Sequence, residues 1–457
     1  MRKIIYLMAL AFVFVSWQKK ETDYAIISGT ITHKSADWKI VSKDQSFSHT
    51  LKINAQGKFS DTLKIREGIY FLYDGKNFAQ LYIENGAAII INADAADFNK
   101  TIKFTGKGSE ATNYLAVKQQ TEDKIVGDQK AFYMLEEAEF KAKSKEIKTG
   151  LETALGGVKG LSESYKTKEK KNINYSYLLR LDNYEKYHEY FAAKPGFKVS
   201  QGFLNDLDGL SYENFEDFNF SEDYRKIIVS YYARQAEIMS KSGSIAEDVA
   251  TIKSIGSISN EGIKNELLYS MAGVGITTTT DLKGYYKEFM AASTNEENKK
   301  TITQSYNKLL IVDIGQPSPK FEGYENNDGG KTSLADLKGK YVYIDVWATW
   351  CGPCMAELPF LKKMEEKYEG KNITFVSISA DKASAHDKWK KMIIDKKLGG
   401  IQLIADKDFD SQFLKDYSIM AIPRFILLDP SGKIVSSNAP RPAEEDKIVK
   451  LFTDLGI

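Results

Sequence analysis

The sequence predicts a multidomain chain with a β-sandwich or barrel at its N-terminal end, a mainly α-helical middle region and a C-terminal α/β domain. Three observations support this division. Apolar residues alternate with polar ones up to about residue 105, recur at helical spacing up to about residue 313, and then form short runs separated by helical patterns. A chain of 457 residues is also too long for one compact core. We therefore expect segments at 1–22, 23–107, 108–313 and 314–457.

The β-rich domain is predicted from alternation with a period of two residues. Apolar and β-branched residues form strand candidates that are separated by Gly, Asn and Asp, at 24–31, 47–53, 68–73 and 87–91. Successive side chains of a strand point to opposite faces of the sheet, so the pattern gives each strand one apolar face. Short strands joined by turns are typical of a small antiparallel sandwich or barrel.

The middle region loses this alternation. Its apolar and aromatic residues recur at helical spacing, as in the stretch from Ile227 to Tyr232. Pro195 is the only proline before residue 317, which favours helices because proline lacks a backbone donor. Aromatic residues such as Tyr184 and Tyr190 are expected to pack between helices. Residues 24–310 show no catalytic combination of side chains.

The composition changes again at 315–319, where two prolines within three residues mark the entrance to a domain. Predicted strands then alternate with predicted helices, and a hairpin and a last helix follow. In chain order these elements lie at 341–346, 354–368, 373–379, 384–396, 401–404, 424–435 and 448–455. Strand–helix alternation of this kind predicts an α/β sheet.

Charge and composition narrow the function classes. Lys and Arg number 63 and Asp and Glu 62, so the chain lacks the basic excess that a general binder of nucleic acid or anionic membrane needs. The four histidines, His33, His49, His188 and His386, are scattered along the chain. A structural zinc site usually takes four ligands, and the two cysteines offer only half of that set. We predict no metal, no cofactor and no nucleic-acid partner.

The N-terminus is typical of an export signal. Arg2 and Lys3 precede an apolar run at 4–15, which has the length of a signal core and is short for a membrane span. The next residues resemble a lipoprotein cleavage region, but Trp17 stands where the lipidated cysteine would be. We expect an exported protein, in the periplasm or facing it from the membrane, whose residues 1–22 are cleaved or remain as a tether. The alternative is a buried first helix of a cytosolic protein.

The two cysteines stand at the junction of a strand and a helix. Cys351-Gly352-Pro353-Cys354 follows the predicted strand 341–346 and opens the next helix. Unpaired backbone N–H groups and the helix dipole stabilise a negative charge at that point, and the thiolate is the form that attacks a disulfide. We assign Cys351 as the nucleophile and Cys354 as the resolving thiol. The alternatives are a local structural disulfide and half of a zinc site.

The residues around this motif resemble a known family. Residues 345–354 (DVWATWCGPC) are similar to the active-site strand and turn of thioredoxin. The extension at 355–359 (MAELP) resembles the TlpA/ResA family of envelope thiol–disulfide oxidoreductases, and so do the segments 315–321 and 333–340. The resemblance covers about 315–457. It implies a thioredoxin-like fold in which the helix and strand at 384–404 form the family's insertion.

The resemblance also implies a binding surface for the substrate. Ile422-Pro423 resembles the family's cis-proline, which lies against the dithiol. Cis peptide bonds are almost confined to X–Pro, and a proline at this place leaves backbone groups free to receive a substrate strand. Trp350, Gly352 and Pro353 are expected to complete this surface around the cysteines.

Two carboxylates are candidates for proton transfer. Asp345 resembles the buried aspartate of thioredoxin, and Glu357 resembles the glutamate of the TlpA/ResA pattern. Either group, if buried near Cys354, would have a raised pKa and could accept the proton of the resolving thiol. Which of the two acts is left open, and the alternative for Glu357 is a solvated helix residue.

These features predict a thiol–disulfide oxidoreductase of the cell envelope that reduces disulfides of exported proteins. The Gly-Pro dipeptide between the cysteines is that of thioredoxin, which is strongly reducing at about −270 mV. Such an enzyme needs protein disulfide substrates, for example oxidised apocytochromes, and a membrane thiol electron donor. The alternatives are a disulfide oxidase or isomerase, and a binding or adaptor protein whose upstream domains capture a partner.

Overall fold

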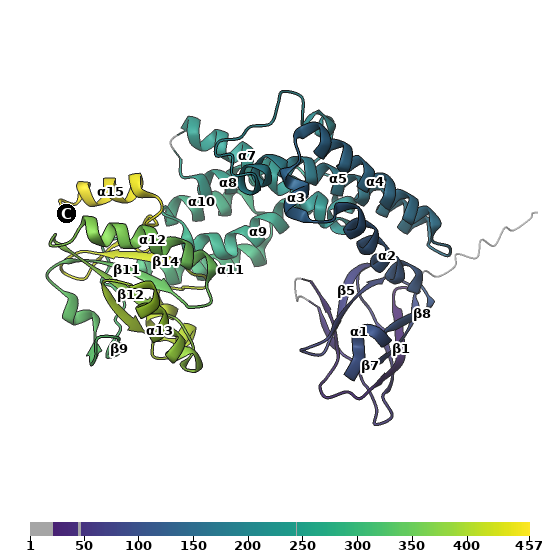
Figure 1. Cartoon of the computed structure of the whole chain (residues 1–457), viewed down its shortest axis with the longest axis horizontal. Coiled ribbons are helices and arrows are strands. Elements are labelled where there is room, and N and C mark those ends of the chain that lie inside the picture. The colour runs from purple at the N-terminus through teal and green to yellow at the C-terminus, as the bar shows by residue number, and fades with distance from the viewer. Residues whose placement is uncertain (1–21, 44–46, 244) are drawn as a thin grey trace, which may run out of the picture. The chain divides into compact units, whose positions relative to one another are not determined.

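The structure of the protein is a computed structural model, and it describes residues 22–43, 47–243 and 245–457. The predicted export signal lies outside the described residues, apart from residue 22. The chain divides into two compact units, which are described separately (Figure 1). The first unit takes in the described residues up to 211 together with 216–227, and the second takes in 212–215 and 228–457.

The first unit begins with two four-stranded sheets, ordered β4-β1-β7-β8 and β3-β2-β5-β6. Their strands are β1 (Ala25–Thr32), β2 (Lys39–Ser42), β3 (Ser48–Thr50), β4 (Lys58–Leu63), β5 (Gly68–Tyr73), β6 (Phe78–Ile83), β7 (Ala88–Asp94) and β8 (Lys103–Lys107). Side chains from both sheets, among them Ile27, Leu72 and Ile89, share one buried apolar core. The β-rich domain is therefore a sandwich.

One strand pair departs from the expected antiparallel arrangement. β1 and β7 run parallel, with Ile27 opposite Ile89. Two parallel neighbouring strands need a crossover connection between them. Here the chain leaves β1, forms strands of the other sheet, among them β2, β5 and β6, and then returns as β7. Gly29 allows the close approach, because a Cβ at this residue would lie 1.8 Å from the carbonyl oxygen of Ile91.

The helices of the first unit follow the sandwich. They are α2 (Ser109–Val126), α3 (Gln129–Met134), α4 (Glu137–Gly157) and α5 (Glu163–Phe191), with α6 (Phe215–Phe220) and the start of α7 (Glu222–Gly243). Tyr184 of α5 packs against Phe140 of α4 with ring centroids 4.2 Å apart. Tyr190 is 76% exposed, so its predicted packing is wrong. Six residues rotate a helix by about 240° beyond a full turn, which places Tyr190 on another face than Tyr184.

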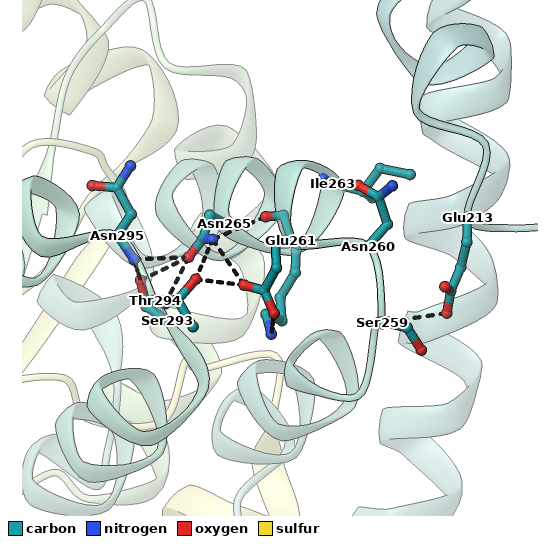
Figure 2. A network of polar contacts seen from close by, with 10 residues as sticks. Glu213, Ser259, Asn260, Glu261, Ile263, Asn265, Ser293, Thr294 and Asn295 are labelled. Atoms are coloured by element: carbon teal, nitrogen blue, oxygen red, sulfur yellow. Dashed lines mark hydrogen bonds and ion pairs between the residues drawn. The ribbon is translucent and has the colours of Figure 1, made fainter.

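The second unit opens with the rest of α7 and with α8 (Glu247–Gly256), α9 (Glu261–Thr278), α10 (Leu282–Ala292) and α11 (Glu296–Leu309). Figure 2 shows how Asn265 of α9 holds the loop between α10 and α11. Its Oδ1 accepts the backbone N–H of Thr294 at 2.9 Å and the hydroxyl of Ser293 at 3.0 Å, and its Nδ2 donates to Thr294 Oγ1 at 2.8 Å. This polar network fixes a loop.

The rest of the second unit is an α/β domain with a seven-stranded sheet ordered β10-β9-β13-β12-β11-β14-β15. Its elements are β9 (Tyr324–Asn326), β10 (Lys331–Thr332), β11 (Tyr341–Trp347), α12 (Gly352–Lys367), β12 (Ile373–Ser379), α13 (His386–Lys396), β13 (Ile401–Ile404), α14 (Gln412–Asp416), β14 (Arg424–Leu428), β15 (Ile434–Ser436) and α15 (Glu445–Asp454). β11 runs parallel to β12 and antiparallel to β14. The predicted fold class, with a thioredoxin-like C-terminal domain, is confirmed.

The centre of this sheet positions the cysteines. Every residue of β11 after Tyr341 is buried, as expected for a strand covered on both faces. Tyr343 shares a core with Leu361 and Met364 of α12 and with Phe452 of α15. β11 is therefore held in the core on both faces where it leads into α12.

Within the described ranges, every helix is too short or too polar to span a membrane.

Candidate active site

The two cysteines lie where β11 ends and α12 begins. Cys351 is the N-cap residue of α12, and Cys354 lies in its first turn. A disulfide joins them, with Cα atoms 5.2 Å apart. The backbone N–H of Cys354 donates to Cys351 Sγ at 3.1 Å, in the way that backbone donors bond an N-cap side chain. In the reduced protein the same donor and the helix dipole would stabilise a thiolate on Cys351.

Three predicted substrate-binding residues surround the disulfide at the surface. Gly352 and Pro353 are exposed in the first turn of α12, where the missing N–H of proline removes one donor that would otherwise lack a helical partner. The side chain of Trp350 is 60% exposed. Its ring centroid lies 6.2 Å from that of Phe409. These residues form an apolar rim beside the sulfur atoms.

The structure brings Ile422 and Pro423 to the same rim. The Ile422–Pro423 peptide bond is cis. Cys351 Sγ lies 3.7 Å from the carbonyl oxygen of Ile422, although the two residues are 71 positions apart in the chain. The side chain of Ile422 packs against the apolar cluster that holds both cysteines. The predicted nucleophile and the predicted substrate loop are therefore in contact.

An apolar layer lies beneath the disulfide. Trp347, Trp389 and Ile393 belong to one buried cluster with the two cysteines. Cys351 is 3% exposed and Cys354 is 2% exposed. A substrate must therefore fit closely against the rim before its own sulfur can reach Cys351 Sγ.

Asp345 is the more deeply buried of the two predicted acids. It pairs with Phe425 across the sheet, and because side chains alternate along a strand it lies on the Tyr343 face of β11, under α12. Its Oδ1 has no hydrogen-bond partner among the described residues. Burial, reinforced by the negative charges of Glu357 and Glu365, raises the pKa of Asp345 to about 8. The carboxyl is therefore protonated at neutral pH in the disulfide form.

Glu357 is buried in α12 and faces the segment before α15. Its Oε2 accepts the backbone N–H of Ala443 at 3.0 Å, and its Oε1 lies 4.0 Å from the guanidinium of Arg441. The side chain is 11% exposed. The alternative of a solvated helix residue is therefore wrong for Glu357, which fastens α12 to the C-terminal segment.

Asp381 was missed by sequence reasoning. It follows the C-terminal end of β12, is 1% exposed, and accepts hydrogen bonds from the backbone N–H and the hydroxyl of Thr349, both at 2.8 Å. The sequence could have indicated Asp381 by its place just after the predicted strand 373–379. The C-terminal ends of neighbouring parallel strands share one edge of an α/β sheet, where sites are commonly built, and β11 delivers the cysteines to that edge.

Arg424 was placed in a strand by the sequence but was not recognised as part of the site. It directly follows Pro423, is 4% exposed, and donates to the carbonyl oxygens of Ser437, at 3.3 Å, and of Thr277 at the C-terminal end of α9. Burial lowers the pKa of Arg424 to about 10. Carbonyl groups at a helix C-terminus favour a cation. The strand after the cis-proline is thus anchored to a helix of the same unit.

The histidines take part in separate contacts. His33 bonds Asp94, His49 bonds Asp61 and His386 bonds Glu325, while His188 bonds the carbonyl oxygen of Tyr133. Within the described ranges, no group of three or more His, Cys, Asp or Glu side chains could hold a metal ion.

Known proteins match the segment that contains this site. The Redoxin family model matches residues 313–451. The thiol–disulfide oxidoreductase ResA of Bacillus cereus is 30% identical over 136 residues, which cover 30% of this chain and 75% of that protein. The chain belongs to the ResA family of thiol–disulfide oxidoreductases. The ResA protein of Bacillus subtilis is 32% identical over 126 residues, which cover 27% of this chain and 66% of that protein.

The ResA-like part of the chain also matches solved structures. The thioredoxin domain of a thiol–disulfide oxidoreductase from Bacteroides vulgatus is 32% identical, covers 32% of this chain and 98% of that chain, and has a TM-score of 0.29. The predicted resemblance to the ResA family is confirmed by the ResA sequences. The protein is a thiol–disulfide oxidoreductase, and the matched segment contains the disulfide between Cys351 and Cys354.

Proposed function

We propose that this ResA-family protein reduces disulfides of exported proteins in the cell envelope. One observation carries the proposal: the Cys351 sulfur lies at the N-terminus of α12 and 3.7 Å from the carbonyl oxygen of Ile422. The helix end stabilises the attacking thiolate, and the cis-proline loop offers backbone groups to a substrate. The export signal predicted at 1–22 supports an envelope location, where disulfides persist in substrate proteins.

The proposed reaction is a two-step exchange. The Cys351 thiolate attacks one sulfur of the substrate disulfide, so that the substrate S–S bond breaks and a mixed disulfide forms. The first substrate thiolate leaves and takes up a proton. The Cys354 thiolate then attacks Cys351 Sγ, which releases the second substrate thiolate and forms the Cys351–Cys354 disulfide. Two electrons pass to the substrate, and a membrane thiol donor is proposed to return the protein to its dithiol form.

The rim of the site indicates the kind of segment that binds. Trp350 is 60% exposed, and Phe409 lies beside it. Met420, two residues before Ile422 in the chain, is 69% exposed. Apolar and aromatic side chains gain most from being covered. We propose that a segment with apolar residues next to its cysteine lies along Ile422 and Pro423, with Trp350, Gly352 and Pro353 on its other side.

The proton acceptor of the second step is proposed to be Asp345 or Glu357. Cys354 must lose its proton before it attacks. Glu357 is a buried residue of α12, and Asp345 is buried under that helix. Asp345 can accept the proton only when it is ionised, and its ionised fraction grows as the pH rises through about 8. We expect Asp345→Asn or Glu357→Gln, or both, to slow the release of product from the mixed disulfide and to change its pH profile, because an amide cannot accept a proton. Rapid-quench measurement of the mixed disulfide from pH 6 to pH 9 checks this. Identical profiles for the two variants and the parent would exclude both residues as the acceptor.

The reduction potential decides the direction of the reaction. For a reductase we expect a value well below about −200 mV, close to that of thioredoxin. The measurement equilibrates the purified full chain in dithiothreitol or glutathione buffers and counts free thiols. A value near about −120 mV would identify an oxidant and contradict the proposed direction. The Cys351→Ser variant, which cannot form the Cys351–Cys354 disulfide, serves as the negative control for the thiol count.

A further inference from the structure

We propose that Asp381 is a positioning residue that fixes the turn carrying Cys351, and that it acts through Thr349. This inference concerns thiol–disulfide exchange itself, and it holds for either direction of the reaction. Asp381 has no role in the two-step exchange described above, and its side chain does not touch the sulfur atoms in any described contact.

The first support is the way Asp381 holds Thr349. Asp381 Oδ2 accepts the backbone N–H of Thr349 at 2.8 Å, and Oδ1 accepts the hydroxyl of the same residue at 2.8 Å. Hydrogen bonds to an ionised acceptor are stronger than neutral ones, and two bonds to one residue fix its orientation as well as its position. Thr349 is 6% exposed, so water cannot easily replace these bonds.

The second support is that Asp381 is itself held in place. The hydroxyl of Ser379 donates to Asp381 Oδ2 at 2.8 Å, and the same oxygen of Ser379 accepts the backbone N–H of Asp381 at 3.1 Å. Beside this contact the backbone N–H of Ala380 donates to the carbonyl oxygen of Trp347 at 2.8 Å. The end of β12 and the turn after β11 are therefore joined by both backbone and side-chain bonds.

The third support is the choice of a carboxylate. Asp381 is 1% exposed, and across the described part of the chain its side chain makes no ion pair with Lys, Arg or His. Burying a charge is costly unless donors satisfy its oxygens. Three donors, two from Thr349 and one from Ser379, share the two oxygens here. An amide would supply only one acceptor oxygen, so asparagine could not hold all three.

The consequence for Cys351 follows from distance along the chain. Thr349 stands two residues before Cys351, and the backbone N–H of Cys351 donates to the carbonyl oxygen of Ala348 at 3.0 Å. Movement of Thr349 would therefore shift Cys351 Sγ relative to both the α12 N-terminus and the carbonyl of Ile422. Away from the helix N-terminus, a thiolate on Cys351 would lose the stabilisation by the backbone N–H of Cys354 and by the helix dipole. A less stable thiolate makes the pair more reducing, because a stabilised reduced form is what makes a dithiol protein oxidising.

The test compares Asp381→Asn and Thr349→Val in the full chain, with Asp387→Asn as the matched control. Asp387 is an exposed carboxylate at the start of α13. We expect Asp381→Asn to lower kcat/KM for a disulfide peptide by roughly tenfold or more, since small displacements of a reacting atom are costly. Its equilibrium with glutathione should also shift toward the disulfide by about tenfold, because the displaced thiolate is less stable. Thr349→Val, which keeps the backbone bond, should lose about fivefold in kcat/KM, the value of one hydrogen bond.

A merely structural role would lower the melting temperature and leave the redox equilibrium unchanged. Parent-like redox equilibrium and parent-like kcat/KM in folded Asp381→Asn would overturn the proposal. If Asp381→Asn does not fold, Thr349→Val decides, and a parent-like kcat/KM in that variant overturns it equally. Asp387→Asn should match the parent in both measurements, and the same shift in this control would show that any lost negative charge produces it.

Discussion

Replacing Cys351 with serine should reduce disulfide turnover to the uncatalysed background. A serine hydroxyl does not form a thiolate, and Cys354 lies inside the first turn of α12, whereas Cys351 is its N-cap residue next to the carbonyl oxygen of Ile422. The measurement is the rate at which the reduced full chain cleaves a fluorogenic disulfide peptide. Turnover that survives in Cys351→Ser would show that Cys354 is the attacking residue.

The matched variant is Cys354→Ser, which keeps the nucleophile and removes the resolving thiol. It should attack once and then stop, because nothing in the chain can displace the bound substrate from Cys351. One equivalent of mixed disulfide should therefore accumulate and be visible by mass spectrometry without reductant. Absence of this adduct, together with full folding, would contradict the assignment of Cys354.

Replacing Asp345 with asparagine should stabilise the disulfide form at pH 7 by up to about 4 kcal/mol. In the folded parent the pKa of Asp345 is raised to about 8, from an ordinary value of 3.8. At pH 7 the folded state therefore keeps a proton that the unfolded chain has released. The folded state binds more protons, so the stability of the parent falls as the pH rises from about 4 to about 8. An asparagine side chain does not titrate, so the variant does not carry the free-energy cost of protonating this group on folding.

The measurement is urea unfolding of the oxidised parent and Asp345→Asn at pH 4 and at pH 7. The difference in unfolding free energy should be large at pH 7 and small at pH 4, because pH 4 lies close to the ordinary pKa of 3.8 and protonating the carboxyl there costs little free energy. Asp387→Asn removes an exposed carboxylate and should show little change at either pH. A variant that is less stable than the parent at pH 7 would contradict the protonated state of Asp345.

The α/β domain was the more predictable part of the fold. Strands at 373–379 and 401–404 were predicted with the bounds that the structure has, because buried parallel strands read as short apolar runs between helices. β9 and β10 were missed, since strands of three and two residues are too short to leave an apolar run in the sequence. In the sandwich the predicted strand at 47–53 shrinks to β3, because the backbone N–H of Ile53 bonds back to the carbonyl oxygen of Leu51 and takes the chain out of the pairing with β2.

The site was predictable where its residues form a local motif. Cys351 and Cys354 stand three positions apart, so their spacing and their place at a helix start were visible in the sequence. The roles of Asp381 and Arg424 were not visible in the sequence, because the residues that they hydrogen-bond, Thr349 and Thr277, are 32 and 147 positions away. The burial of Asp345 could be expected from an acid inside an apolar strand, whereas its lack of a hydrogen-bond partner depends on packing that no spacing reveals.

The cysteine content has a consequence for how the protein acquires its disulfide. The 457 residues contain two cysteines, and the disulfide between Cys351 and Cys354 uses both. Four cysteines could pair in three ways, but two can pair in only one. Oxidation during folding in an oxidising compartment therefore cannot scramble this chain. A protein that exchanges disulfides with others thus presents no second disulfide of its own that could be rearranged.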